Sequence, residues 1–144
     1  MRILSYLLIL GLVVSLSSCK VRSTPSVAEI TCKELVVATP DVFTPLAENV
    51  SVTKIFMENE CLSVRVKFKG CEQSGFDLMY NGKAKKSSPP QVNLMLKSLD
   101  INCESSEETE RDFKFDIKKL QGIGGSGKVV ISVQGFSESL VYQY

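Results

Sequence analysis

Five cysteines are the residues of this chain whose type and spacing best suit a defined chemistry. A cysteine thiol can be acylated, oxidised to a disulfide, or deprotonated to bind zinc. Cys19 stands apart from the others, because it directly follows Leu16-Ser17-Ser18 at the end of an apolar run. The other four are Cys32, Cys61, Cys71 and Cys103. The cysteines therefore divide into one beside an N-terminal signal and four that can pair.

The N-terminal segment has the layout of a secretory signal. Arg2 supplies a positive charge, residues 3–16 are mostly apolar, and the small residues Ser17-Ser18 precede Cys19. This layout resembles the cleavage and acylation signal of bacterial lipoproteins. The resemblance implies that residues 1–18 are removed as a signal peptide and that Cys19 carries the lipid. The apolar run is shorter than the ~20 residues that a membrane-spanning helix needs.

The expected mature chain consists of a tether and one domain. Residues 19–29 are polar, include Pro25 and lack apolar periodicity, which predicts a flexible tether. Residues 30–144 are long enough for a single domain with one core. Basic and acidic residues balance once Arg2 is removed, since the whole chain has 17 Lys and Arg against 16 Asp and Glu. A near-neutral domain is not expected to bind nucleic acid, which requires a basic excess.

The four remaining cysteines are an even set, which favours two disulfides in an exported chain. A zinc site requires closely spaced cysteine pairs, whereas the nearest two, Cys61 and Cys71, are separated by nine residues. We therefore expect neither a metal site nor a cofactor. Three disulfide connectivities are possible for four cysteines.

Strand pairing favours one of these connectivities. If residues 76–98 form a β-hairpin, Cys71 and Cys103 meet at its base. This leaves Cys32 to pair with Cys61. The sequence therefore predicts the disulfides Cys32–Cys61 and Cys71–Cys103.

Apolar residues alternate along most of the expected domain, with no sustained helical period. In residues 61–69 one face of the predicted strand is apolar, with Leu62, Val64, Val66 and Phe68. Further segments that suggest strands lie at residues 35–38, 50–57, 76–80, 91–98, 113–117, 129–133 and 140–144. This pattern predicts an all-β fold, an antiparallel β-sandwich of the immunoglobulin-like Greek-key type. A small β-barrel is the alternative.

Two segments imitate catalytic or ligand-binding motifs. Residues 122–129, GIGGSGKV, have the glycine spacing of phosphate-binding loops, but those loops lead into a helix and this one leads into an apolar strand-like segment. The dense carboxylates of residues 104–112, ESSEETERD, are expected to form a solvated loop. The chain has no histidine, which removes Ser–His and Cys–His nucleophiles. We therefore expect that the protein is not an enzyme.

The loop of the predicted hairpin, residues 81–90, is basic. Its lysines are Lys83, Lys85 and Lys86. If residues 61–69 run antiparallel to residues 76–80, a Cys32–Cys61 bond brings the tether to the lysine end of the domain. We then expect the lysines to face an anionic membrane surface, with a solvated loop as the alternative.

A set of short stretches carries a second resemblance. The stretches are CE at 71–72, GFDL at 75–78, PPQVNL at 89–94, Cys103 and FKFDI at 113–117. Through them, residues 60–120 resemble small cysteine-containing lipoproteins of the Bacteroidota. The resemblance implies a compact, lipid-anchored β domain and assigns no catalytic residue.

Lys20, which follows Cys19, bears on the expected location. In enterobacterial lipoproteins an Asp at this position marks retention in the inner membrane, and in some lipoproteins of the Bacteroidota an acidic tract just after the cysteine marks export to the cell surface. The sequence has neither, which predicts an outer-membrane anchor with the domain in the periplasm. We expect a non-catalytic binding or accessory module for an envelope protein or a glycan, with recognition by loops or sheet edges. The alternatives are a purely structural envelope lipoprotein and a hydrolase inhibitor.

Overall fold

The computed structural model describes residues 31–39, 46–70, 74–99, 107–125 and 127–144. Within these ranges the chain forms strands and two short 3₁₀ turns. The strands are β1 (Lys33–Glu34), β2 (Val36–Val37), β3 (Val50–Glu58), β4 (Cys61–Lys69), β5 (Gly75–Lys85), β6 (Gln91–Leu99), β7 (Glu108–Asp116), β8 (Lys128–Val133) and β9 (Ser139–Gln143). The 3₁₀ turns are η2 (Lys118–Leu120) and η3 (Ile123–Gly125). No helix in the described ranges is long and apolar enough to cross a membrane.

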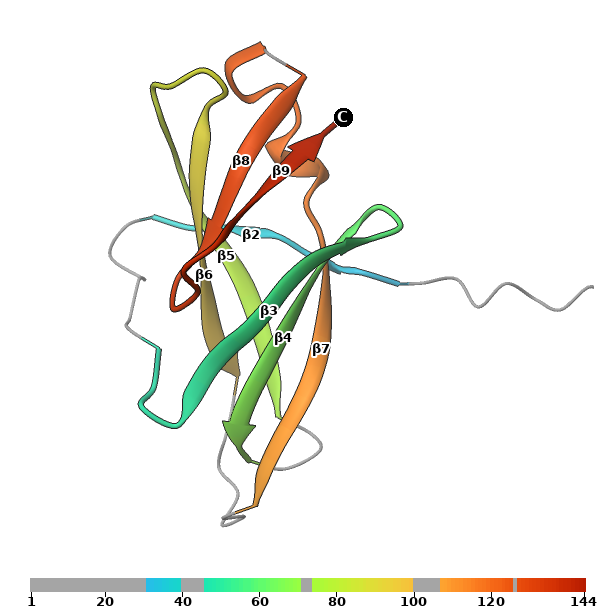
Figure 1. Cartoon of the computed structure of the whole chain (residues 1–144), viewed down its shortest axis with the longest axis vertical. Coiled ribbons are helices and arrows are strands. Elements are labelled where there is room, and N and C mark those ends of the chain that lie inside the picture. The colour runs from blue at the N-terminus through green and yellow to red at the C-terminus, as the bar shows by residue number, and fades with distance from the viewer. Residues whose placement is uncertain (1–30, 40–45, 71–73, 100–106, 126) are drawn as a thin grey trace, which may run out of the picture.

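The strands form two sheets that pack against each other (Figure 1). The four-stranded sheet has the order β1-β7-β4-β3, and the five-stranded sheet has the order β2-β5-β6-β8-β9. In the described part of the chain, no strand of one sheet pairs with a strand of the other. The predicted β-sandwich is therefore confirmed, and the alternative of a closed barrel is excluded.

The chain crosses between the sheets after β4, returns for β7 and crosses again for β8. The sheets are mixed, whereas we expected antiparallel pairing throughout. Four strand pairs are antiparallel, but β1–β7, β2–β5 and β6–β8 are parallel. Parallel neighbours require a crossover connection, and the segment from β7 through η3 supplies it between β6 and β8.

The core lies between the sheets and confirms the predicted strand faces. The apolar face of β4 is 0–1% exposed, and its residues are Leu62, Val64, Val66 and Phe68. They pack with the inward residues of β5 and β6 from the other sheet. Burial of apolar side chains stabilises the fold by about 1.5–3 kcal/mol for each large residue. On the outward face of β4, Cys61 and Ser63 are buried as well.

Two strands are longer than the apolar alternation predicts. β5 continues to Lys85 after a register irregularity that follows Tyr80, so the first half of the expected loop 81–90 belongs to a strand. β7 begins at Glu108, inside the segment expected to be a solvated loop. Pairing with basic residues of β4 explains the second difference, because charged side chains of opposite sign face each other across these strands.

One edge of the sandwich is closed by β1, Leu35 and β2, which we call the N-terminal strap. The strap pairs first with β7 and then with β5, and so joins both sheets. Leu35 is fully buried, and its N–H donates to Asp116 O at 3.2 Å. A disulfide joins Cys32 to Cys61 with a Cα–Cα distance of 6.1 Å, which confirms that predicted pair.

Candidate functional site

A hollow lies at the other edge of the sandwich, between the β3–β4 turn and β9. We call it the β3–β9 groove; it has a volume of about 360 Å³. Met57 at the end of β3 and Asn59 in the turn line one side, and Tyr142 and Tyr144 at the end of the chain line the other. Gln121, which follows η2, is also part of the lining, and the remaining lining residues are Glu60, Lys118, Val141 and Gln143. The groove thus combines apolar, aromatic and amide side chains.

Tyr142 is the anchor of this groove. Its ring is 8% exposed and belongs to the core, while its Oη accepts a hydrogen bond from Gln121 Nε2 at 2.8 Å. The ring of Tyr144 lies 5.5 Å from that of Tyr142, and Tyr144 is 38% exposed. Tyrosine offers a broad apolar face with one polar end, which is why it is enriched at recognition surfaces.

The charges that line the groove balance each other. Lys118 Nζ lies 3.4 Å from Glu60 Oε2, and both side chains are well exposed. The groove therefore presents aromatic faces and amides around one solvated ion pair. Such a surface can bind a neutral ligand, because it carries no net charge that selects an ionic one.

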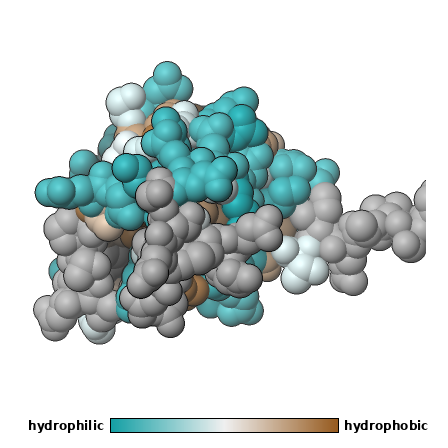
Figure 2. All heavy atoms as spheres, turned by 90° about the horizontal axis from the view of Figure 1, so that it is seen from below, coloured by the Kyte–Doolittle hydropathy of each residue, from teal (hydrophilic) through white to brown (hydrophobic). Residues whose placement is uncertain are grey.

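A second hollow, of about 300 Å³, lies where β3 begins and β4 ends. Its lining is polar and charged and includes Lys67 and Glu108, whose side chains pair at 2.9 Å. In the view from below, the described surface is mainly hydrophilic, and apolar atoms show only in small separate areas (Figure 2). This hollow offers less apolar surface to a ligand than the β3–β9 groove does.

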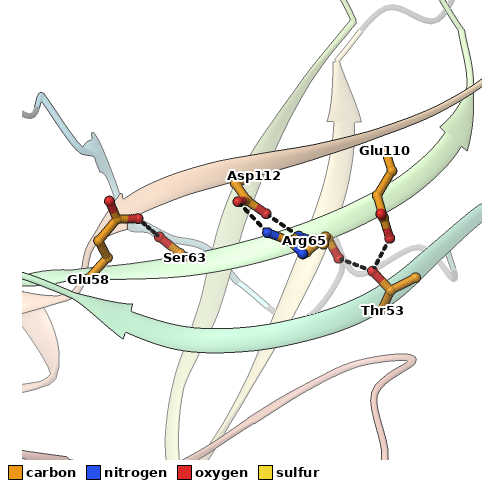
Figure 3. A network of polar contacts seen from close by, with 6 residues as sticks. All are labelled: Thr53, Glu58, Ser63, Arg65, Glu110 and Asp112. Atoms are coloured by element: carbon orange, nitrogen blue, oxygen red, sulfur yellow. Dashed lines mark hydrogen bonds and ion pairs between the residues drawn. The ribbon is translucent and has the colours of Figure 1, made fainter.

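The outward face of the four-stranded sheet carries a network of paired charges (Figure 3). Arg65 of β4 donates to both carboxylate oxygens of Asp112 of β7, at 2.7 and 2.9 Å. Thr53 of β3 donates its hydroxyl to Glu110 of β7 at 2.7 Å. These contacts tie the three strands β3, β4 and β7 together across their solvent-facing surface.

On the same face, the carboxylate of Glu58 is also paired with a basic side chain. Glu58 accepts hydrogen bonds from Lys114 Nζ at 2.8 Å and from the Ser63 hydroxyl at 3.3 Å. The hydrogen bond from Lys114 lowers the pKa of Glu58, and that from Arg65 lowers the pKa of Asp112. A lowered pKa in the folded state stabilises the fold above the ordinary carboxyl pKa, and this contribution disappears as the pH falls. A general acid needs the opposite shift, so neither carboxyl is suited to that role.

The acidic segment 104–112 is only partly described. In its described part Glu108, Glu110 and Asp112 point from β7 to partners on β3 or β4. The described residues contain no cluster of three or more acidic or cysteine side chains that could hold a metal ion. These three carboxylates of β7 therefore form contacts between neighbouring strands.

The glycine-rich segment 122–129 is a connection between strands, as predicted. It leads through η3 into β8 and not into a helix, so it lacks the helix N-terminus of phosphate-binding loops. Gly124 has a φ of +71°, and a Cβ at this position would lie 2.8 Å from Pro90 Cγ. A glycine is needed here because the connection packs closely against the end of the β5–β6 hairpin.

The basic residues of the expected loop lie mostly in a strand. Lys83 and Lys85 lie in β5 and Lys86 follows it, all three exposed. The N-terminal strap lies along the first half of the same strand: Lys33 pairs with Asp77 at 2.7 Å, and β2 pairs with Met79 and Tyr80. From Tyr80 the chain reaches Lys83 after about 10 Å of strand.

The tether itself, residues 19–29, lies outside the described residues. That the tether and the lysines share one end of the domain, and that the lysines face the membrane, both stay predictions.

The remaining predicted cysteines lie outside the described residues. Cys19 belongs to the undescribed N-terminal range, and Cys71 and Cys103 fall in the gaps 71–73 and 100–106. The Cys71–Cys103 bond therefore stays a prediction. The hairpin register supports it, because Gly75 pairs with Leu99 and the same register, continued, would oppose residues 71 and 103.

The β3–β9 groove was not predicted from the sequence. The alternation of residues 140–144 places Tyr142 and Tyr144 on one face, which was a usable signal. Nothing in the sequence indicates that Met57 and Gln121 complete the lining, because these residues belong to distant segments.

No family model and no curated protein matches the chain. Among solved structures, it is similar to a protein of unknown function, DUF1344, from Bacteroides vulgatus, with a TM-score of 0.49 and 12% identity over 78% of this chain and 56% of that one. A NigD-like immunity protein from Bacteroides caccae gives a TM-score of 0.49 and 16% identity over 78% and 59%. A putative toxin-related protein from Parabacteroides distasonis gives 0.47 and 10% over 78% and 60%.

The chain thus spans less than two thirds of the length of each of these three proteins. At 10–16% identity, the similarity concerns the arrangement of strands and not activity or partners.

Proposed function

We propose that this chain is a lipid-anchored module of the bacterial envelope, held by Cys19, that binds a protein or glycan without catalysing a reaction. The observation that carries the binding role is the β3–β9 groove, whose lining includes two tyrosines and three amide residues at an edge of the sandwich. Neutral polar groups beside aromatic faces suit recognition of a polypeptide or a sugar. The carboxylates with shifted pKa values lie on another face and are paired.

The two alternatives make different use of the structure. A purely structural lipoprotein needs no partner in the groove. A hydrolase inhibitor needs a rigid exposed loop, and the sequence offers GIGGSG and KSSPP as candidates. The first of these loops packs against Pro90 of the second, so the two form one unit at the end of the sandwich.

Anchorage is tested by replacing Cys19. We expect Cys19→Ser to lower the membrane-bound fraction of the protein about tenfold or more, because several acyl chains supply the binding energy. The measurement is fractionation of bacterial cells followed by immunoblotting, and Ser17→Ala, which keeps a small residue in the signal, is the matched control. Retention of the Cys19→Ser chain in the membrane fraction would contradict the anchor.

The groove is tested by photocrosslinking in living cells. With the photoreactive residue p-benzoylphenylalanine in place of Tyr144, we expect a discrete crosslinked product from the envelope, since this position is exposed beside the groove. The control replaces Val37, which is 56% exposed on the opposite edge strand of the same sheet. Protease and glycosidase treatment of the product distinguishes a protein from a glycan. Identical products at both positions, or none at Tyr144, would argue against binding in the groove.

A further inference from the structure

We propose that the free edge of β9 binds an extended polypeptide segment of a partner protein, which adds to the five-stranded sheet as a further strand. This inference deepens the proposed function and rests on it, because the added strand would lie along the β3–β9 groove. The groove alone could bind either a protein or a glycan, and the open edge of β9 favours the protein. It also names the backbone groups that make the contact.

The four edge strands of the sandwich differ in how well they are protected. A free strand edge exposes backbone donors and acceptors, and proteins usually block it with short strands, bulges, charges or proline. β1 and β2 have two residues each and adjoin the Cys32–Cys61 disulfide. β3 has a register irregularity between Val52 and Lys54 and carries that lysine. β9 is Ser139–Gln143, without charge, proline or bulge, and is the least protected described edge.

The backbone of β9 shows which groups face outward. The N–H of Tyr144 donates to Gly127 O at 3.0 Å, toward the β8 side of the sheet. N–H and C=O directions alternate along a strand, so Tyr142 also faces β8, whereas Val141 and Gln143 direct their backbone groups to the open edge. Donors and acceptors with this spacing match the backbone of an extended polypeptide. An oligosaccharide has no such regular series of backbone groups.

The side chains along the edge define the segment that fits. Val141 is 57% exposed and lies on the face of the sheet opposite to Tyr142, while Tyr142 and Tyr144 line the inner side of the groove. Alternate side chains of an added strand would therefore contact the tyrosines and Met57, and the others would lie beside Val141. The Glu60–Lys118 pair leaves no net charge there. The partner segment is consequently uncharged, extended and apolar at the positions that enter the groove.

Proline at Val141 provides a sharp test. Val141→Pro removes an N–H that points away from β8, so the ladder that holds β9 keeps its bonds while the outer edge loses a donor. Gln143→Pro removes the other outward N–H, closer to the end of the strand. It replaces Val141→Pro in the experiment if circular dichroism shows that Val141→Pro folds poorly. Val141→Ala is the matched control, because it removes the side chain and keeps the N–H.

The probe is an uncharged octapeptide of alternating threonine and valine, added to the full chain in detergent micelles and followed by amide NMR. We expect the largest shifts at the amides of Val141 and Gln143. We also expect affinity to fall about tenfold or more in either proline variant and to fall clearly less in Val141→Ala, which trims a contacting side chain but keeps the N–H. An octapeptide with alternate backbone nitrogens methylated should not bind.

Equal binding of the methylated peptide, or unchanged binding by both proline variants, would overturn strand addition. If binding then still depended on Tyr144, as judged by Tyr144→Ala, the groove would remain the binding site and the proposed function would stand. If Tyr144→Ala and the two proline variants all left peptide binding unchanged, both strand addition and binding in the groove would be contradicted. A concentration-dependent dimer that both proline variants abolish would assign the edge to a second copy of this chain and would also overturn the inference.

Discussion

Replacing Cys32 and Cys61 together by serine should lower the free energy of unfolding by about 3.5 kcal/mol. The disulfide closes a loop with a sequence separation of 29 residues, and a loop of that length restricts the unfolded chain by about this amount in the chain-entropy model. Urea denaturation of the variant and the wild-type chain, without reducing agent, measures the difference. The midpoint should fall and the slope m should rise slightly, because the unfolded chain exposes more surface without the cross-link.

A matched control separates the covalent bond from the contacts of the strap. Lys33→Ala removes the ion pair with Asp77 but keeps the disulfide, and its cost should stay below about 1 kcal/mol because the lysine is half exposed. The double serine variant should also speed hydrogen exchange at the amide of Leu35, which donates to Asp116 O. A loss smaller than about 1 kcal/mol in the double variant would mean that the strap is held by packing alone.

Phe76→Ala should destabilise the protein by about 3–5 kcal/mol, the range for removing a large aromatic side chain from a packed core. Phe76 is 1% exposed and belongs to β5 of the five-stranded sheet. Its ring lies 5.3 Å from that of Phe68 and 4.9 Å from that of Phe113, both of the other sheet. The substitution therefore leaves a cavity where three aromatic rings join the two sheets. Thermal or urea denaturation measures the loss.

Two further variants make this result specific. Phe76→Leu keeps most of the apolar volume and should cost less than the alanine variant. Val141→Ala removes an exposed apolar side chain from β9 and should change stability by no more than about 0.5 kcal/mol. Similar losses for Phe76→Ala and Val141→Ala would contradict the assignment of Phe76 to the centre of the core.

The strands of the core were predictable because alternation is a local property of the chain. The apolar residues of the segment 61–69 repeat with period two, and the same residues form the buried face of β4. The Cys32–Cys61 bond was predictable too, because it followed from the expected pairing of the neighbouring hairpin and from the even number of cysteines. These features can be predicted from short segments of the chain or from the number of cysteines.

The full length of β7 was not predictable by the same means. Its first half, Glu108–Asp112, has no apolar alternation and looks like a polar loop. It is a strand because Arg65 and other basic residues of β4 lie opposite its carboxylates. A single segment does not reveal its neighbour, so pairing energy that comes from a distant strand cannot be seen in the local pattern.

Local patterns along the chain were thus enough to predict the strand content, the predominantly β core and the pairing of Cys32 with Cys61, and they also indicate the signal before Cys19 that predicts a lipid anchor. The fold adds that the N-terminal strap lies along the first half of β5 and that β9 is an edge strand of the described five-stranded sheet. Side-chain alternation depends on neighbours along the chain, whereas the choice of edge strands depends on which distant segments pair. The β3–β9 groove exists because packing two sheets brings Met57 beside Tyr142.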